Sequence, residues 1–422
     1  MSDQEGAPRG DAVTQGPATL APPIESFSLA TGFRAAAAAC GLKSGGALDL
    51  ALVVAERPGA AAGVFTTNRI QAAPVLFDRE VLGRNAGDVR AVIANSGCAN
   101  ACTGPGGLED ARAMAALAAR GLGCRAEQVL VLSTGVIGRR LDMAKLERGI
   151  ALVTSSRAEA GAGAAARAIM TTDTRPKIAM IEAAAGARKV VIRGFAKGAG
   201  MIHPNMATML AVLTTDAGIA PGPLQAALGQ AVRRSFNRVS VDGDMSTNDT
   251  VLLLASGRAG EITDRAGLDA FMAALTACCV SLARQIARDG EGATRLVEIA
   301  VSGAADEDEA HRVSDAIARS PLVKSAIHGG DPNWGRILAA AGASGAALEP
   351  GRLRLALGPP GAAIAVVEAG LPLAYDERAA SAALRADPVH IRLDLGLGPA
   401  EATVWTCDLS AEYVAINAHY TT

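Results

Sequence analysis

The chain has 422 residues, of which 50% are hydrophobic and 19% charged, and its formal net charge at pH 7 is −2. A chain of this length and apolar content can bury large cores, and we expect it to fold as more than one domain. The near-neutral balance, without a basic block, argues against binding to nucleic acid or to a membrane surface.

The cysteines and the N-terminal segment argue against a secreted, disulfide-bonded protein. Seven scattered cysteines do not fit a secreted disulfide framework. Cys98 and Cys102 have no partner pair at metal-ligand spacing, so we expect no metal site. Residues 1–24 lack the apolar core of a secretory signal and are expected to form a disordered tail. The most apolar stretch, residues 271–283, is too short to span a membrane, and we expect a cytoplasmic protein.

The first half of the chain predicts a mixture of strands and helices. Apolar runs bounded by turn residues predict strands at residues 48–54, 62–68 and 91–97, and a helix is expected over residues 108–122. Residues 129–138 predict a strand that opens into a turn at Thr134 and Gly135. Gly135 can simply supply the turn, with Thr134 as its cap. Alternatively, the Thr134 hydroxyl and the Gly135 N–H form an oxyanion hole for developing negative charge.

The segment around residue 208 is the most informative part of the sequence. Helices are expected over residues 143–155 and 157–170 and a strand over residues 189–193. Glycines and Pro204 then prevent a regular element until the apolar run that begins at Thr208. A chain cut before Thr208 would expose an N-terminal threonine whose α-amine can take the proton of its own hydroxyl. A plain turn followed by a β-forming threonine is the competing interpretation.

The second half of the chain continues in the same mixed pattern. Helices are expected over residues 221–234, 266–288 and 309–320, strands over residues 251–255 and 296–301, and a strand-rich region over residues 353–415. The loop at residues 239–250 contains Asp242, Asp244 and Asp249, but it lacks the final glutamate of a calcium-binding loop. We therefore expect a polar loop that bonds to its own backbone. His328 to Arg336 is expected to be a glycine-rich loop.

Several motifs resemble one known family. The fourteen residues Lys-Gly-Ala-Gly-Met-Ile-His-Pro-Asn-Met-Ala-Thr-Met-Leu, 197–210, closely resemble the self-cleavage motif of the ornithine acetyltransferases of arginine biosynthesis, also called glutamate N-acetyltransferases. Ser-Thr-Gly-Val-Ile-Gly at 133–138, Gly-Glu-Gly-Ala-Thr at 290–294 and the C-terminal Tyr-Val-Ala-Ile-Asn-Ala are similar to other segments of that family. The resemblance implies an α/β fold, an αββα sandwich with a smaller C-terminal α/β region.

The resemblance also implies a precursor that cleaves itself between Ala207 and Thr208. The products would be an α chain, whose ordered part is 25–207, and a β chain, 208–422, assembled as α2β2. The implied nucleophile is Thr208, with Thr134 and Gly135 as the oxyanion hole. The implied substrate-binding residues are Thr174, Lys197, Thr208, Glu291, Asn417 and Thr422, with Thr172 as an alternative to Thr174.

The implied reaction moves an acetyl group from N2-acetyl-L-ornithine to L-glutamate through an acetyl-threonine intermediate. No cofactor is expected, although acetyl-CoA is a possible alternative donor. An N-terminal-nucleophile aminopeptidase or amidase of the same fold would share the cleavage but pass its acyl group to water. A non-enzymatic binding protein with this fold would keep one intact chain.

Overall fold

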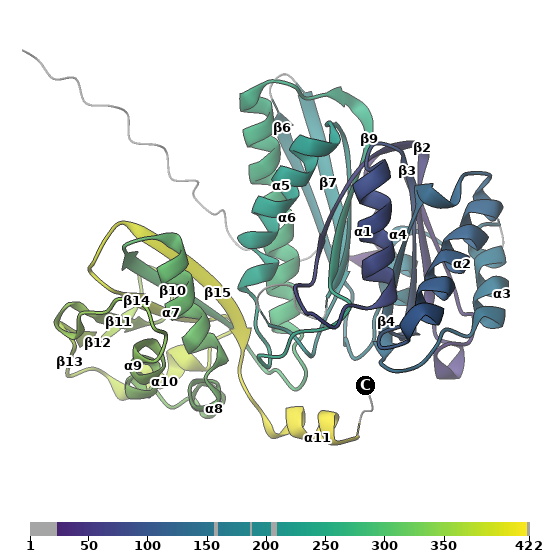
Figure 1. The fold of residues 1–422 in the computed structure, drawn as a ribbon. Coiled ribbons are helices and arrows are strands. Elements are labelled where there is room, and N and C mark those ends of the chain that lie inside the picture. The colour runs from purple at the N-terminus through teal and green to yellow at the C-terminus, as the bar shows by residue number, and fades with distance from the viewer. Residues whose placement is uncertain (1–22, 156–158, 186–187, 204–208, 420–422) are drawn as a thin grey trace, which may run out of the picture.

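The computed structural model describes residues 23–155, 159–185, 188–203 and 209–419 (Figure 1). In the main body, the strands are β1 (Phe33–Ala38), β2 (Leu50–Phe65), β3 (Val89–Cys98), β4 (Val129–Val136), β5 (Glu159–Ala160), β6 (Lys177–Ala185), β7 (Arg188–Lys197), β8 (Leu210–Gly218) and β9 (Thr250–Glu261). Its helices are α1 (Ala73–Asn85), α2 (Gly104–Leu122), α3 (Met143–Val153), α4 (Ala162–Ala168), α5 (Pro221–Arg233) and α6 (Arg265–Arg288).

Strand β2 connects the two sheet layers of this body. The strand order is β4-β3-β2-β9-β8-β7-β6; β1 pairs with β2, and β5 pairs with β1. The first part of β2 pairs with β3, and the part from Ala60 to Phe65 pairs with β9. The expectation of two separate strands at 48–54 and 62–68 was therefore wrong. The pairing shifts between Val54 and Gly59, so one strand passes from the first layer to the second without a turn.

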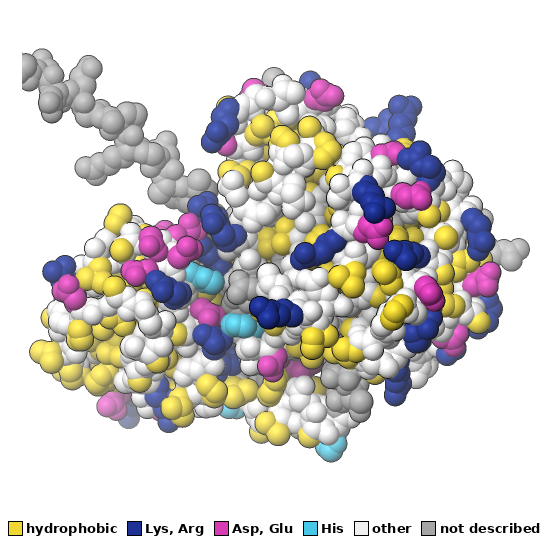
Figure 2. All heavy atoms as spheres, viewed as in Figure 1, with side chains coloured by type: hydrophobic (Ala, Val, Ile, Leu, Met, Phe, Trp, Pro, Cys, Tyr) yellow, Lys and Arg dark blue, Asp and Glu magenta, His cyan; other side chains and the backbone are white. Residues whose placement is uncertain are grey.

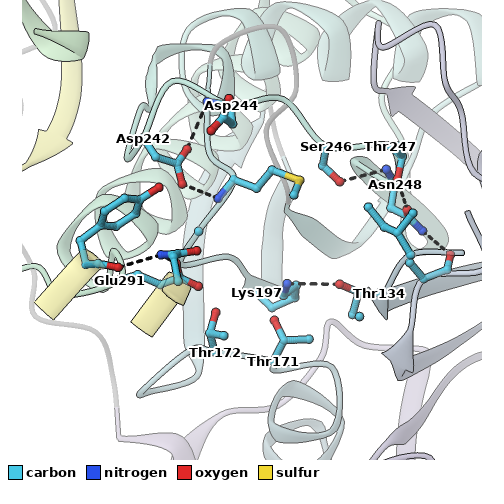
Figure 3. Close-up of a pocket in the computed structure, with 17 residues that line it drawn as sticks. Thr134, Thr171, Thr172, Lys197, Asp242, Asp244, Ser246, Thr247, Asn248 and Glu291 are labelled. Atoms are coloured by element: carbon cyan, nitrogen blue, oxygen red, sulfur yellow. Dashed lines mark hydrogen bonds between the residues drawn. The ribbon is translucent and has the colours of Figure 1, made fainter. Parts of the chain in front are cut away.

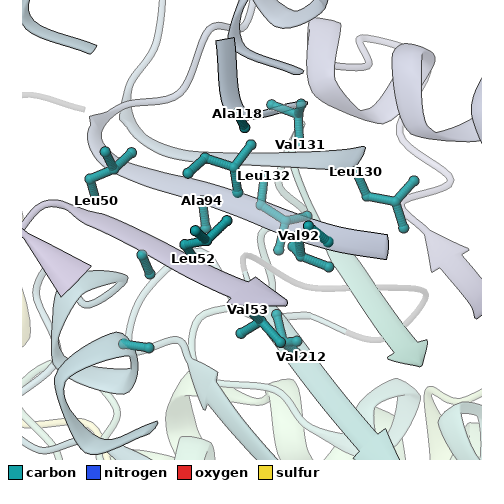
Figure 4. Close-up of a cluster of buried hydrophobic side chains, with 14 of the residues drawn as sticks. Leu50, Leu52, Val53, Val92, Ala94, Ala118, Leu130, Val131, Leu132 and Val212 are labelled. Carbon is teal, nitrogen blue, oxygen red and sulfur yellow. The ribbon is translucent and has the colours of Figure 1, made fainter. Parts of the chain in front are cut away.

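The layers form the expected αββα sandwich. One core lies between the β1–β4 layer and its covering helices α2 and α3, and it extends to the inward faces of β7, β8 and β9. Figure 4 shows Val212 of β8 beside Val53, with leucines and valines of β2, β3 and β4 around them. A second core lies between the outer face of β6–β9 and helices α5 and α6. In Figure 1, helices α5 and α6 lie on one side of the two sheet layers, and helices α2 and α3 lie on the other.

Helix α6 is long and apolar enough, by length and composition, to cross a membrane. Its apolar side, which includes Phe271, Leu275, Cys278 and Leu282, is buried in the second core instead. The side chain of Asp264 caps the helix by accepting a hydrogen bond from the N–H of Gly267. The apolar character of α6 is thus explained by packing on the sheet.

The C-terminal part forms a smaller α/β unit, as expected. Its strands are β10 (Leu296–Ala304), β11 (Arg354–Leu357), β12 (Ile364–Glu368), β13 (Leu371–Pro372), β14 (Val389–Asp394) and β15 (Ala400–Cys407), in the order β13-β12-β11-β14-β10-β15. Its helices are α7 (Glu307–Arg319), α8 (Pro321–Gly329), α9 (Trp334–Gly342) and α10 (Glu377–Leu384), and α11 (Ala411–His419) follows the last strand. This unit has its own apolar core.

Other local expectations need correction. The predicted helix at 157–170 is shorter: Glu159–Ala160 pairs with β1 as strand β5, and the helix covers only Ala162–Ala168. The predicted loop from His328 to Arg336 contains the end of α8 and the start of α9. Gly330, with φ of 69°, ends α8, and the Asn333 side chain caps α9. On the face in Figure 2, basic and acidic side chains are interspersed, in line with the small net charge.

Candidate active site

A pocket of about 120 Å³ lies where β4 and β7 end and where α11 returns to the main body (Figure 3). Segments from both halves of the sequence form it. Its lining residues are Ala99, Thr134, Gly135, Ile137, Thr171, Thr172, Lys197, Gly200, Met201, Asp242, Asp244, Ser246, Thr247, Asn248, Glu291, Tyr413 and Asn417. We call Thr134, Gly135 and Lys197 the floor of the pocket, and Glu291, Tyr413 and Asn417 its rim. Five of the six residues in these two groups are predicted site residues; Tyr413 is the addition.

Thr134 and Gly135 lie within strand β4, just before its last residue, rather than in the turn that the sequence predicted. Gly135 has a φ of 129°, and a Cβ atom there would lie 2.4 Å from the carbonyl carbon of Gly97. Only glycine fits this close approach of β4 to β3. The side chain of Asn248 fixes the strand end from the other side, because its Nδ2 donates to the carbonyls of Ser133 (2.8 Å) and Ala99 (2.6 Å).

Lys197 is the last residue of β7, and its side chain is buried beside Thr134. The Lys197 Nζ lies 3.2 Å from Thr134 Oγ1, and the residues are only 2% exposed each. Figure 3 shows the two side chains pointing toward one another. Burial lowers the pKa of the Lys197 ammonium, while the nearby carboxylate of Asp173 opposes that change.

A buried chain of charges supports the floor from behind. The Lys177 side chain is fully buried, and its Nζ bonds both to Asp173 and to Asp289, the latter at 2.5 Å. Asp173 also accepts hydrogen bonds from the N–H groups of Gly198 (2.7 Å) and Thr171 (2.9 Å). Burial alone would raise the pKa of Asp173, but Lys177 and Lys197 hold it below its ordinary value.

The predicted threonine at 174 is exposed and does not line the pocket. The Thr174 hydroxyl donates to Asp289, and its backbone N–H lies 3.0 Å from the same carboxylate. Thr171 and Thr172 line the pocket, and Figure 3 shows both near Lys197. The structure thus places Thr172, the alternative that the sequence left open, at the cavity.

The rim joins the segment after α6 to helix α11. The Asn417 Nδ2 donates to Glu291 Oε2 at 2.8 Å, and the Glu291 N–H donates to the carbonyl of Ala199 at 2.8 Å. A Cβ atom at Gly200 would lie 2.4 Å from the Glu291 carboxyl carbon, so glycine admits this side chain. The C-terminal segment therefore reaches the pocket through Tyr413 and Asn417.

Asp242 holds the segment that leads toward residue 204. Its carboxylate accepts hydrogen bonds from the N–H groups of Met201 (2.5 Å), Ile202 (2.8 Å) and Asp244 (3.2 Å). Burial raises the pKa of Asp242 to about 6, against the effect of these donors. Only the bond to Asp244 is the local contact that the sequence predicted. No pattern in the sequence indicated the longer-range contacts. Tyr413 begins the quoted C-terminal motif, but it was not predicted as a site residue.

Asp249 holds the other side of residues 204–208. Its Oδ1 accepts the Met209 N–H at 2.9 Å, and Leu210 lies opposite Lys197 in the β7–β8 ladder. The predicted cleavage residues Ala207 and Thr208, and the predicted binding residue Thr422, lie outside the described residues. Within the described part of the chain, no group of His, Cys, Asp and Glu has an arrangement suited to a metal ion.

Comparisons with known proteins agree with this architecture. The ArgJ family model matches residues 34–422. The chain is 49% identical over 391 residues to the arginine biosynthesis bifunctional protein ArgJ of Parasynechococcus marenigrum, covering 93% of this chain and 94% of that protein. A protein of the same name from Symbiobacterium thermophilum is 49% identical over 397 residues, with 93% and 97% covered.

A solved structure, ornithine acetyltransferase of Mycobacterium tuberculosis complexed with ornithine, is 44% identical, with a TM-score of 0.35; the match covers 42% of this chain and 92% of that one. Taken together, the fold, the polar pocket and the sequence relatives define an enzyme of the acyltransferase class. The chain belongs to the ArgJ family, because the family model and these relatives match nearly its whole length. The resemblance found in the cleavage motif is thereby confirmed.

Proposed function

We propose that this protein is a glutamate N-acetyltransferase that moves an acetyl group from N2-acetyl-L-ornithine to L-glutamate in arginine biosynthesis. We place it in the cytoplasm as an α2β2 assembly of cleaved chains. The observation that carries the proposal is the anchoring of the cleavage motif, beside one polar pocket, on either side of residues 204–208. Met201 on one side is held by Asp242, and Met209 on the other side is held by Asp249.

Self-cleavage begins when the Thr208 hydroxyl attacks the carbonyl carbon of Ala207. The peptide C–N bond breaks, the chain continues as an ester on the threonine oxygen, and the Thr208 amine becomes free. Water then hydrolyses the ester, which leaves a carboxylate on Ala207 and restores the hydroxyl. The new N-terminus supplies both nucleophile and base.

Acetyl transfer uses the same threonine twice. Its hydroxyl attacks the amide carbonyl of N2-acetylornithine, and its α-amine accepts the proton and passes it to the leaving amine of ornithine. The acetyl group remains as an ester on Thr208. The amine of glutamate then attacks that ester, N-acetylglutamate leaves, and the hydroxyl is regenerated. In each step the Thr134 hydroxyl and the Gly135 N–H stabilise the oxyanion.

The pocket residues divide the task of substrate recognition. The Lys197 ammonium suits the α-carboxylate that ornithine and glutamate share. The pocket lining supports Thr172 as the threonine that faces substrate, while Thr174 holds the loop through Asp289. Asn417, Glu291 and Thr422 contribute from the C-terminal side, with Glu291 suited to the side-chain ammonium of ornithine. No bound cofactor is required, and acetyl-CoA is a second possible donor.

Intact mass spectrometry and a transfer assay test this function together. We expect two chains, one beginning at Thr208, and acetylglutamate formation from acetylornithine that requires glutamate. Acetate release that glutamate does not affect would instead indicate an amidase or aminopeptidase. Running acetyl-CoA as donor in parallel determines whether the protein has one acetyl source or two.

The nucleophile is tested by Thr208→Ala, with Thr208→Ser as the matched control. The alanine variant should remain one chain and show no transfer, because it has no hydroxyl. The serine variant keeps the hydroxyl and should cleave and transfer at a reduced rate. Two bands of normal size from Thr208→Ala would refute the assignment.

A further inference from the structure

The contact between Lys197 and Thr134 has a defined polarity. The Lys197 Nζ and the Thr134 Oγ1 are 3.2 Å apart, and both side chains are buried. An ammonium group carries three donors and no acceptor, whereas a hydroxyl can donate one proton and accept through its lone pairs. The lysine must therefore donate, and the threonine oxygen must accept.

The remaining question is where the hydroxyl proton of Thr134 points. Among the residues that the structure describes, no acceptor for this proton is found, and the hydroxyl lines the pocket. We propose that Lys197 is a positioning residue that orients the Thr134 hydroxyl with its proton directed into the pocket, as an oxyanion donor. This inference rests on the proposed function and deepens it, because it gives Lys197 a role besides contacting substrate.

The surrounding groups hold Lys197 in this position. Its backbone lies opposite Leu210 in the β7–β8 ladder, and the next N–H, that of Gly198, is fixed by Asp173. The charged groups that face its ammonium come from several elements: the carboxylates of Asp173, Asp249 and Glu291, and the ammonium groups of Lys43 and Lys177. Burial disfavours the charged form of Lys197, and the carboxylate of Asp173 is the main group that favours the charged lysine that must donate.

Loss of the lysine proton would reverse the contact. A neutral amine has a lone pair, so it can accept the Thr134 proton and turn the hydroxyl away from the pocket. Burial lowers the pKa of Lys197, and the transfer rate should therefore fall with rising pH below the usual titration range of lysine. The loss develops as pH rises through the folded pKa, because only the protonated form supports the productive orientation.

A double-mutant cycle on the acetyl-transfer reaction tests the orientation. Thr134→Val removes the donor and should lower kcat by about 10²–10³-fold. Lys197→Met should lower kcat to a similar extent, and the double variant should be no slower than Thr134→Val alone. Losses that multiply, or a Lys197→Met effect confined to KM, would overturn the inference and leave Lys197 as a substrate contact only. Absence of transfer by the wild-type protein would overturn the proposed function itself, and this inference with it.

A second measurement covers the case in which Lys197→Met does not mature. Lys197→Arg keeps a donor that stays charged at every accessible pH. Its transfer rate should lose the alkaline decline that the wild type shows. The control is Lys43→Arg, a half-buried lysine nearby whose Nζ bonds to the Met170 carbonyl at 2.8 Å, and it should retain the decline. An unchanged alkaline decline in Lys197→Arg would refute the orienting role.

Discussion

The floor of the pocket is buried and rigidly held, whereas its rim is open to solvent. Lys197 ends β7, Thr134 lies near the end of β4, and both side chains are almost inaccessible. Asn417 is exposed on α11, a helix that follows the last strand of the C-terminal unit. Electrostatic interactions are stronger at the buried floor, where the effective dielectric constant is low, than at the solvent-exposed rim. Under the proposed mechanism, we therefore expect the floor to determine the chemistry of both half-reactions and the rim to adjust substrate affinity.

The largest effect is expected where the charges behind the floor are broken. Lys177→Met leaves Asp173 and Asp289 buried without their shared cation, and it should lower the free energy of unfolding by about 3–5 kcal/mol. Chemical denaturation measures this change. Lys189→Met is the matched control, because Lys189 forms a solvent-exposed pair with Glu182 and should change stability very little. Equal stability of the two variants would contradict a structural role for the buried pairs.

The second prediction concerns the backbone of the floor. Gly135→Ala places a Cβ atom 2.4 Å from Gly97 and should displace the Gly135 N–H, which lowers kcat on the order of 10²-fold. Steady-state kinetics with acetylornithine measures the loss. Gly138→Ala is a close control: its φ of 81° is also unfavourable for alanine, but no heavy atom lies within 4 Å of the added Cβ. If both variants retain normal kcat, Gly135 does not serve the oxyanion.

The contrast between floor and rim also explains what the sequence could predict. Local sequence patterns were sufficient to predict β3, β4, α2, α5 and α6, because the apolar residues of each element recur with its period. Thr134, Lys197, Glu291 and Asn417 were found by their motifs and lie at one pocket. Their roles remain predictions, whereas their proximity is a property of the structure.

The parts that sequence reasoning missed depend on distant partners. Lys177 lies in β6, where a lysine following Pro176 gave no strand signal, and its partner Asp289 is 112 positions away. Its burial is stable only because two carboxylates meet it there. Helix α11 was similarly unexpected, since nothing local distinguishes it from a frayed chain end. Tertiary contacts, not local propensity, decide both cases.

At the rim, Asn417→Ala should have a moderate effect on binding. It removes the donor to Glu291 Oε2, and we expect KM for acetylornithine to rise about tenfold, or about 1.4 kcal/mol, with kcat nearly unchanged. Initial-rate kinetics separates the two constants. Val414→Ala, an exposed position on the same helix away from the pocket lining, should leave both constants as they are. A loss confined to kcat would instead indicate that Asn417 acts in the chemical step and not in substrate binding.

The smallest effect is a pH dependence at Asp242, which ties the rim to the cleavage segment. Burial raises its pKa in the folded protein to about 6, above the value near 3.9 of an unfolded aspartate. Between about pH 4 and 6 the folded state thus binds more protons than the unfolded state, and stability falls as pH rises. Asp242→Asn removes this titration, so its thermal midpoint should decline less than that of the wild type across this window. Asp244→Asn removes a neighbouring charge that is a minor cause of the raised pKa, so it should reduce the slope less than Asp242→Asn does. A wild-type slope in Asp242→Asn would show that another group titrates there.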